Sequence, residues 1–224
     1  MVLPETEANL PLDLKHDVAP IGLVGELPMV ISIHPSLGVN TLPELIALAK
    51  KRPGQVLYGG GRNTFPHLTG LAFSSRAGID LTFVAYPTSG KAINDVLGGT
   101  LTLFVEGLAA QAGLIEGGSL RPLAVASAKR LPNFPDLPTV AETIPGFEAS
   151  GWFALMAPAG THEAIVQKVN HDLRVVLEQP DVQHKLEMLG TYARPTSPAE
   201  TADFIRREQD LWRPVVKQAV LAPH

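Results

Sequence analysis

Short apolar runs alternate with amphipathic helical patterns along most of this chain, and this alternation restricts its fold more than any other feature. The predicted strands cover residues 29–33, 55–58, 79–86, 100–105 and 120–127, and the predicted helices begin near Thr41, Pro66, Ser89 and Ala109. Strands that alternate with helices are typical of a sheet with helices packed on its faces. The sequence therefore predicts an α/β fold.

The last third of the chain has a different pattern and is mostly helical. A long helix is predicted from Thr161, and a short helix is predicted over 181–189. The sequence Ser197-Pro198-Ala199-Glu200 is a capping box that opens a final helix. Pro214 is expected to kink or end that helix, because proline lacks a backbone N–H and clashes with the preceding turn.

Two extended segments, near Ile31 and Phe153, are predicted to carry the chain between two lobes. Residues 36–150 contain most of the alternating strands and helices and are assigned to the second, more complete lobe. The flanks, 1–35 and 151–224, are assigned together to the first lobe. A chain of 224 residues is long enough for one large domain or two small ones.

Composition excludes several classes of protein. Hydrophobic residues make up 45% of the chain, which allows a sizeable core, and the net charge of −4 without a Lys/Arg cluster argues against nucleic-acid binding. The absence of cysteine removes disulfides, thiolate chemistry and cysteine-based metal sites. No run is long and apolar enough to span a bilayer. Residues 1–13 are acidic and contain proline, unlike a signal peptide.

The segment YGGGRNTFPHL, residues 58–68, carries the most informative chemistry. Three glycines follow a predicted strand, and a helix begins after them with Asn63 or Thr64 as its cap and Pro66 in its first turn. Glycine lets a backbone approach a ligand, the N–H groups of a helix start favour an anion, and the guanidinium of Arg62 suits a carboxylate. The two interpretations are an anion-holding loop and an ordinary strand-to-helix turn.

Three further side chains are candidates for a site. His34 and His67 each lie by a strand end or a helix start; a structural role is favoured for His34, and for His67 a ligand role is weighed against it. Glu106 follows the apolar strand Leu101-Phe104, where it either accepts from a ligand hydroxyl or ammonium group or merely ends the strand. Asp95 could meet Glu106, although its position inside a helix favours a solvated or capping role.

The motifs of catalysis and of cofactor binding are missing. Ser89-Gly90-Lys91 lacks the earlier glycine and the following Ser or Thr of a phosphate loop, and Gly59-x-Gly61-x-x-Thr64 lacks the last glycine of the dinucleotide fingerprint. His162-Glu163 has Val166 where a metal site needs histidine, and no G-x-S-x-G elbow is present. We therefore expect no catalytic residue, no metal and no cofactor.

Seven stretches of this chain stand in an order and at a spacing that match one known family. They are VAPIGLV (18–24), TLPELIALAKKRPG (41–54), YGGGRNTFPHLTG (58–70), VAY (84–86) with AINDVLGG (92–99), LRPLAVASAKRLPNFPDLPTVAE (120–142), PGFEASGWFALMAPAG (145–160) and residues 196–212. In order and spacing they resemble the extracytoplasmic solute receptors of tripartite tricarboxylate transporters, the Bug or TctC family. The resemblance runs from about residue 17 to the C-terminus.

This resemblance implies a type II periplasmic binding fold, in which two α/β lobes joined by crossing strands close over a small organic carboxylate. It also implies a periplasmic receptor that delivers its ligand to the permease subunits of a membrane transporter, without enzymatic turnover, nucleic acid or insertion into the membrane. The predicted ligand-binding residues combine the glycine run with the positions that the resemblance indicates: Gly60, Gly61, Arg62, Asn63, Thr64, His67, Tyr86, Thr88, Ser89 and Glu106.

The chain also departs from the family pattern. The family begins with a signal peptide, a strand and a proline-glycine loop, and this chain starts after that region, so the first lobe is expected to be incomplete. Arg62, Phe65 and Lys91 stand where small residues are usual. The alternatives are a truncated receptor without function, an α/β enzyme, and a cytoplasmic small-molecule sensor of the same fold, for which residues 1–17 are too short to supply a helix-turn-helix segment.

Overall fold

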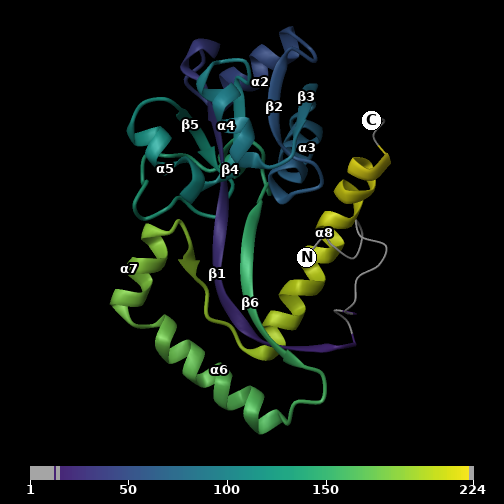
Figure 1. Ribbon diagram of the computed structural model, residues 1–224, viewed down its shortest axis with the longest axis vertical. Coiled ribbons are helices and arrows are strands. Elements are labelled where there is room, and N and C mark those ends of the chain that lie inside the picture. The colour runs from purple at the N-terminus through teal and green to yellow at the C-terminus, as the bar shows by residue number, and fades with distance from the viewer. Residues whose placement is uncertain (1–12, 14–15, 222–224) are drawn as a thin grey trace. The chain divides into compact units, whose positions relative to one another are not determined.

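The computed structural model describes residue 13 and residues 16–221 (Figure 1). The chain forms two compact units, one over Pro28–Gly151 and the other from the residues up to Leu27 together with those from Trp152 onward. Strands β1 (Val18–Ile33) and β6 (Ser150–Pro158) contain the points where the chain passes from one unit to the other. The assignment of the flanks to an incomplete first lobe stays a prediction.

The unit over 28–151 is built on a sheet in the order β3-β2-β4-β1-β5. Its strands besides β1 are β2 (Val56–Gly61), β3 (Leu81–Tyr86), β4 (Leu103–Gly107) and β5 (Arg121–Val125). Strand β2 is parallel to β3 and to β4, whereas β1 is antiparallel to β4 and to β5. Because β1 alone runs in the opposite direction, the other four strands share one carboxyl edge.

Helices follow the strands of this sheet and surround it in Figure 1. They are η1 (Pro35–Leu37), α2 (Leu42–Lys51), α3 (Phe65–Ala77), α4 (Ser89–Leu97), α5 (Leu108–Glu116) and η2 (Val140–Glu142). Helix α2 begins as predicted, since the Thr41 hydroxyl accepts from the backbone N–H of Glu44 at 3.3 Å, and Lys50 and Lys51 lie in its last turn. The predicted α/β fold is confirmed.

The core of this unit lies between the sheet and its helices. Phe104 is fully buried in a cluster with Ala92, Val96, Leu101 and Leu120. Each large apolar side chain buried in this way contributes about 1.5–3 kcal/mol relative to exposure. The strands thereby become fixed in register, which sets the position of their carboxyl ends.

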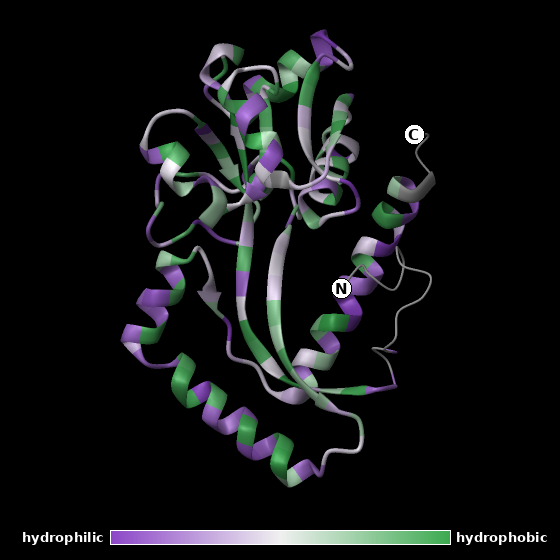
Figure 2. Cartoon of the chain, in the orientation of Figure 1, coloured by the Kyte–Doolittle hydropathy of each residue, from purple (hydrophilic) through white to green (hydrophobic). Residues whose placement is uncertain are grey.

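The other unit contains the first part of β1, paired with β6 and with the short strand β7 (Tyr192–Ala193). Its helices are α6 (Glu163–Leu177), α7 (Pro180–Met188) and α8 (Pro198–Leu221). Polar and apolar residues alternate along α6 in Figure 2, as expected for a helix with one face on a sheet. Val166 of α6 packs against Ile21 and Ala157.

Two helix boundaries differ from the predictions. Helix α6 begins after His162, whose Nδ1 accepts from Ala164 N at 3.2 Å, whereas the Thr161 hydroxyl donates back to the carbonyl of Pro158. Pro214 does not end α8, because the helix continues to Leu221, and the alternative of a kink at this residue stays a prediction. Trp212 and Val216 are 5% and 1% exposed on either side of the proline, so buried packing offsets the lost hydrogen bond. Among the described helices, none has the length and apolar character to cross a membrane.

Candidate functional site

Three parallel strands end at one edge of the larger sheet, and each leads directly into a helix. Strand β2 ends at Gly61 before α3, β3 ends at Tyr86 before α4, and β4 ends at Gly107 before α5. In parallel sheets, ligands bind outside the carboxyl ends of the strands. All ten predicted ligand-binding residues lie in the unit over 28–151, at or beside these three strand ends.

The three helices that start at this edge lack side-chain caps. Thr64, Thr88 and Gly107 are their N-cap residues, and none makes a capping hydrogen bond through a side chain. Helices α2 and α6, in contrast, are capped by Thr41 and His162. The first-turn N–H groups of a helix carry its positive dipole end and need acceptors. This edge therefore presents three helix starts suited to an anion.

The glycine run is not the loop that we predicted, because β2 extends through all three glycines. Gly59, Gly60 and Gly61 pair with residues 84–86 of β3. Close neighbours explain the glycines: a Cβ on Gly59 would lie 2.6 Å from Leu101 Cδ1, and a Cβ on Gly61 would lie 2.7 Å from Thr64 Cγ2. The glycines thus allow close packing of the sheet, and only Arg62 and Asn63 remain for the turn.

That turn has an unusual backbone. Asn63 has a positive φ, +59°, and no other non-glycine residue in the described part of the chain has a positive φ. Asparagine tolerates this left-handed conformation better than most side chains. The hydroxyl of Thr64 donates to the carbonyl of Gly61 at 2.7 Å, which turns it away from the first turn of α3.

His67 stabilises the same turn from inside the helix. Its Nδ1 accepts a hydrogen bond from the backbone N–H of Asn63 at 3.1 Å, and its ring stacks on Phe83 with 3.8 Å between ring centroids. The side chain is buried, and burial, followed by the positive charge of Arg62, lowers the pKa of His67 to about 4. The imidazole is therefore neutral near pH 7 and carries its proton on Nε2.

Arg62 is exposed beside this turn, and no carboxylate in the described part of the chain forms an ion pair with it. Its guanidinium is thus available to a ligand anion. Arginine forms two parallel hydrogen bonds to a carboxylate in the best geometry. The ligand role of Arg62 and of its neighbours stays a prediction.

The second strand end carries Tyr86, whose hydroxyl donates to the carboxylate of Asp95 on α4. This hydrogen bond raises the pKa of Tyr86 above its ordinary value. Thr88 is exposed and is the N-cap residue of α4, and Ser89, near which this helix was predicted to begin, is its first residue. The structure thus gives Asp95 a hydrogen-bonded role beside the site.

At the third strand end, Glu106 lies within β4, opposite Val30 of β1, and not after the strand as predicted. One oxygen of its half-buried carboxylate accepts from Gly107 N at 2.9 Å. Gln111 is a residue that the sequence analysis missed: it is fully buried, and its amide donates to the carbonyls of Val30 and Glu106. Its signal was a single polar residue in the apolar helical stretch LAAQAGLI.

The chemistry of this edge is that of binding. The helix starts and the guanidinium of Arg62 carry N–H groups of the kind that bind an anion, and Glu106 adds a carboxylate beside them; their ligand roles stay a prediction. Within the described part of the chain, no three His, Cys, Asp or Glu side chains are grouped so that they could hold a metal ion.

The sequence over residues 1–221 matches the family described as Tripartite tricarboxylate transporter family receptor. It is 34% identical to Protein BugT of Bordetella pertussis over 94% of this chain and 65% of that protein. The structure of R. palustris Rpa4515 with adipate aligns with a TM-score of 0.83 and 32% identity, over 97% of this chain and 73% of the other. The periplasmic binding protein BugD aligns with a TM-score of 0.74 and 28% identity, over 92% of this chain and 71% of the other.

The chain spans about two thirds of the length of the curated relatives that it matches, at 65%, 63% and 66% of the first three. The matches cover both compact units, since they include nearly all of the chain.

Proposed function

This chain belongs to the family of receptors of tripartite tricarboxylate transporters, and on that basis we propose that it binds a small organic carboxylate and delivers it to a membrane permease of that class. Family members are binding receptors, and we further propose that this chain acts in the periplasm and does not alter its ligand. The ligand contacts are assigned to the carboxyl edge of β2, β3 and β4.

One observation carries this proposal more than any other: three helices start at the same sheet edge without side-chain caps. A ligand carboxylate would supply the acceptor that the capping side chains of Thr41 and His162 supply at α2 and α6, although α7 also begins without a side-chain cap. The ligand carboxylate also gains from the positive ends of the helix dipoles, each worth about 0.3–1 kcal/mol in exposed sites and up to about 2 kcal/mol when partly buried.

We propose a dicarboxylate as the ligand class. The relative from R. palustris has adipate bound, at 32% identity to this chain. Adipate carries two carboxylates at the ends of a four-carbon chain, so that one anion can lie at the Arg62 turn and the other at a neighbouring helix start. The permease and the transported acid of this chain remain part of the proposal.

Calorimetric titration tests the function directly. The purified chain is titrated at pH 7.5 with adipate, then with succinate and citrate, and with 1,6-hexanediol as the matched control, which has the carbon skeleton of adipate without its charges. We expect saturable binding of at least one carboxylate and none of the diol. No heat from any carboxylate at millimolar concentration, or equal heats for adipate and the diol, would reject carboxylate binding. Recovery of chemically altered acid would instead indicate an enzyme.

A further inference from the structure

Two helices of the same unit begin with nearly the same sequence. Helix α2 is preceded and opened by Asn40-Thr41-Leu42-Pro43-Glu44, and α3 by Asn63-Thr64-Phe65-Pro66-His67. In both, a threonine is the N-cap residue and a proline lies in the first turn. The first helical residue is apolar in both, Leu42 in α2 and Phe65 in α3, whereas the third is a glutamate in α2 and a histidine in α3.

The third helical residue makes the same hydrogen bond in both segments. The Glu44 carboxylate accepts from the backbone N–H of Asn40 at 2.6 Å, and the His67 imidazole accepts from the backbone N–H of Asn63 at 3.1 Å. Each side chain therefore holds the backbone N–H of the asparagine that precedes the cap, one residue earlier than the N–H that a capping-box glutamate binds. His67 thus does in α3 what Glu44 does in α2.

Two other helices of this chain have glutamate as their third helical residue. The starts of η2 and α8 pair Thr139 with Glu142 and Ser197 with Glu200, with the hydroxyl and the carboxylate each accepting a backbone N–H. Those carboxylates place a negative charge at the positive end of a helix. Helix α3 instead has His67 at the position where α2, η2 and α8 have glutamate, and it is one of the helices that start at the candidate site.

The threonine differs as well. In α2 the Thr41 hydroxyl accepts from the N–H of the third helical residue at 3.3 Å. In α3 the Thr64 hydroxyl donates to the Gly61 carbonyl instead and caps nothing. The start of α3 thus keeps the backbone bond that shapes the turn but lacks both groups that would compete with a bound anion, the capping hydroxyl and the carboxylate.

We propose that His67 is a positioning residue that holds the Asn63 turn as Glu44 holds the Asn40 turn of α2, while keeping the start of α3 free of negative charge so that it accepts a ligand anion. This inference rests on the proposed function for the choice of ligand, but its electrostatic part holds for any small anion. It assigns His67 a role through the turn, without direct ligand contact.

The surroundings of the ring favour the uncharged form. Phe83 of β3 stacks on one face, and Arg62 is the charged group that acts on the imidazole. Burial and this positive charge together disfavour the imidazolium, whose second N–H would oppose the donor of Asn63. The turn and the neutral state of His67 therefore support each other.

Three variants separate the hydrogen bond to the turn from the charge at the helix start. His67→Gln keeps a neutral acceptor, and His67→Glu places a carboxylate at the position that Glu44 has in α2. Glu44→Gln, which removes the charge at the start of α2, is the control. Each is examined by thermal unfolding, by adipate titration, and by ¹H–¹⁵N spectra of the backbone amides around 63–68 and 41–45 during titration with sodium sulfate against sodium chloride at equal ionic strength.

We expect His67→Glu to unfold within a few degrees of wild type yet to bind adipate at least tenfold more weakly and to lose the sulfate-induced shifts at 63–68. His67→Gln should stay within threefold of wild type, and Glu44→Gln should leave adipate binding unchanged. If wild type binds adipate and His67→Glu binds it equally well, the inference is wrong while the function stands. If wild type does not bind adipate, the sulfate titration tests the inference by itself. Sulfate-induced shifts at 63–68 in wild type that vanish in His67→Glu would support it, and the absence of these shifts from wild type would overturn it.

Discussion

The indole Nε1 of Trp212 donates a hydrogen bond to the carboxylate of Glu208, one helical turn earlier in α8, at 3.2 Å. The carboxylate is partly buried, and Trp152 also donates a hydrogen bond to it. Burial raises the pKa of Glu208 above its ordinary value, with the negative charge of Glu26 adding to the rise, and the two indoles and Arg194 oppose it. Burial outweighs the hydrogen bonds, so the folded protein disfavours the ionised carboxylate.

A raised carboxyl pKa has a definite sign for stability. Just above the ordinary value of 4.5, folded Glu208 holds more protons than unfolded Glu208, so stability falls as pH rises through that window. Glu208→Gln should remove this fall and be more stable than wild type at pH 7, with the two curves meeting at low pH. Thermal unfolding from pH 4 to 8, followed by tryptophan fluorescence, measures it. A variant that is less stable than wild type at pH 7 would show that the indole hydrogen bonds dominate.

His67 produces a slope of the opposite sign. Its pKa falls from 6.5 in the unfolded chain to about 4 in the folded protein, so the unfolded chain binds more protons between these values. Stability should therefore be lost as pH falls from about 6.5 to 4, by at most about 3 kcal/mol at 1.36 kcal/mol per pKa unit. His67→Gln should flatten this part of the curve in urea unfolding series at fixed pH. An unchanged slope in the variant would assign the acid sensitivity to other groups.

Arg62→Ala tests the predicted carboxylate contact. Removing one partner of a hydrogen-bonded charge pair in a closed site costs on the order of 2–5 kcal/mol, or roughly 30-fold and more in affinity. An exposed arginine without a ligand contact is worth less than about 1 kcal/mol. Adipate titration distinguishes the two, with Arg52→Ala, an exposed arginine of the same unit, as the control. Affinity within about threefold of wild type in Arg62→Ala would leave the backbone amides as the anion site.

Gly70 lets α3 lie close to β2. A Cβ at this position would be 2.3 Å from Cε2 of the buried Tyr58 ring, so Gly70→Ala should destabilise the protein by about 1–3 kcal/mol through overpacking. Gly113→Ala in α5 is the matched control, because nothing lies within 4 Å of its Cβ position. It should gain about 0.5–1 kcal/mol from helix propensity. Equal effects of the two substitutions in chemical denaturation would contradict the packing argument.

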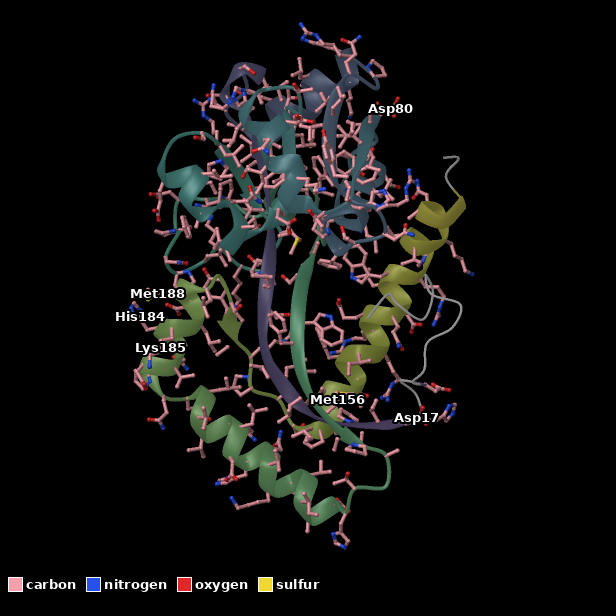
Figure 3. The ribbon with its side chains drawn as sticks, viewed as in Figure 1. Asp17, Asp80, Met156, His184, Lys185 and Met188 are labelled. Carbon is pink, nitrogen blue, oxygen red and sulfur yellow. The ribbon has the colours of Figure 1, made fainter. Side chains whose placement is uncertain are left out.

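Exposed large apolar side chains gather in the unit that holds the two flanks of the chain. Of the nine among the described residues, Leu97 alone lies in the other unit; the rest are Phe153, Leu155, Ile165, Val175, Val176, Met188, Leu189 and Leu211. Met188, at the end of α7, is 74% exposed (Figure 3). An exposed apolar patch of more than a few hundred Å² marks an interface, and we predict that these side chains supply one and that the protein self-associates.

Phe153 and Leu155 are suited to test this expectation. They alternate along β6 with Trp152, which packs against Phe204 of α8, so they face the opposite side of the strand. Light scattering over a concentration series should show oligomers for wild type and fewer for the double variant Phe153→Ser/Leu155→Ser, with Leu97→Ser in the other unit as the control. A wild type that stays monomeric up to about millimolar concentration would contradict the prediction.

The features that the sequence determined by itself are those that depend on neighbours along the chain. The capping box at Ser197–Glu200 formed as predicted, and the hydroxyl of Thr41 caps α2, because these hydrogen bonds join residues three positions apart. The α/β alternation also followed from local periodicity, and the order of short motifs was enough to indicate the family.

The tertiary structure decided the features that depend on contacts between residues far apart in the sequence. The glycine run lies in β2 and pairs with β3, and Leu101 and Tyr86, which are distant in the sequence, occupy the space that a side chain at Gly59 would need. Helix α8 passes Pro214 because buried packing around it outweighs one lost hydrogen bond. His67 is neutral because Phe83 and the surrounding core exclude water from it. In each case the deciding energy is burial, and which groups are buried is set by contacts between segments that the linear sequence keeps apart.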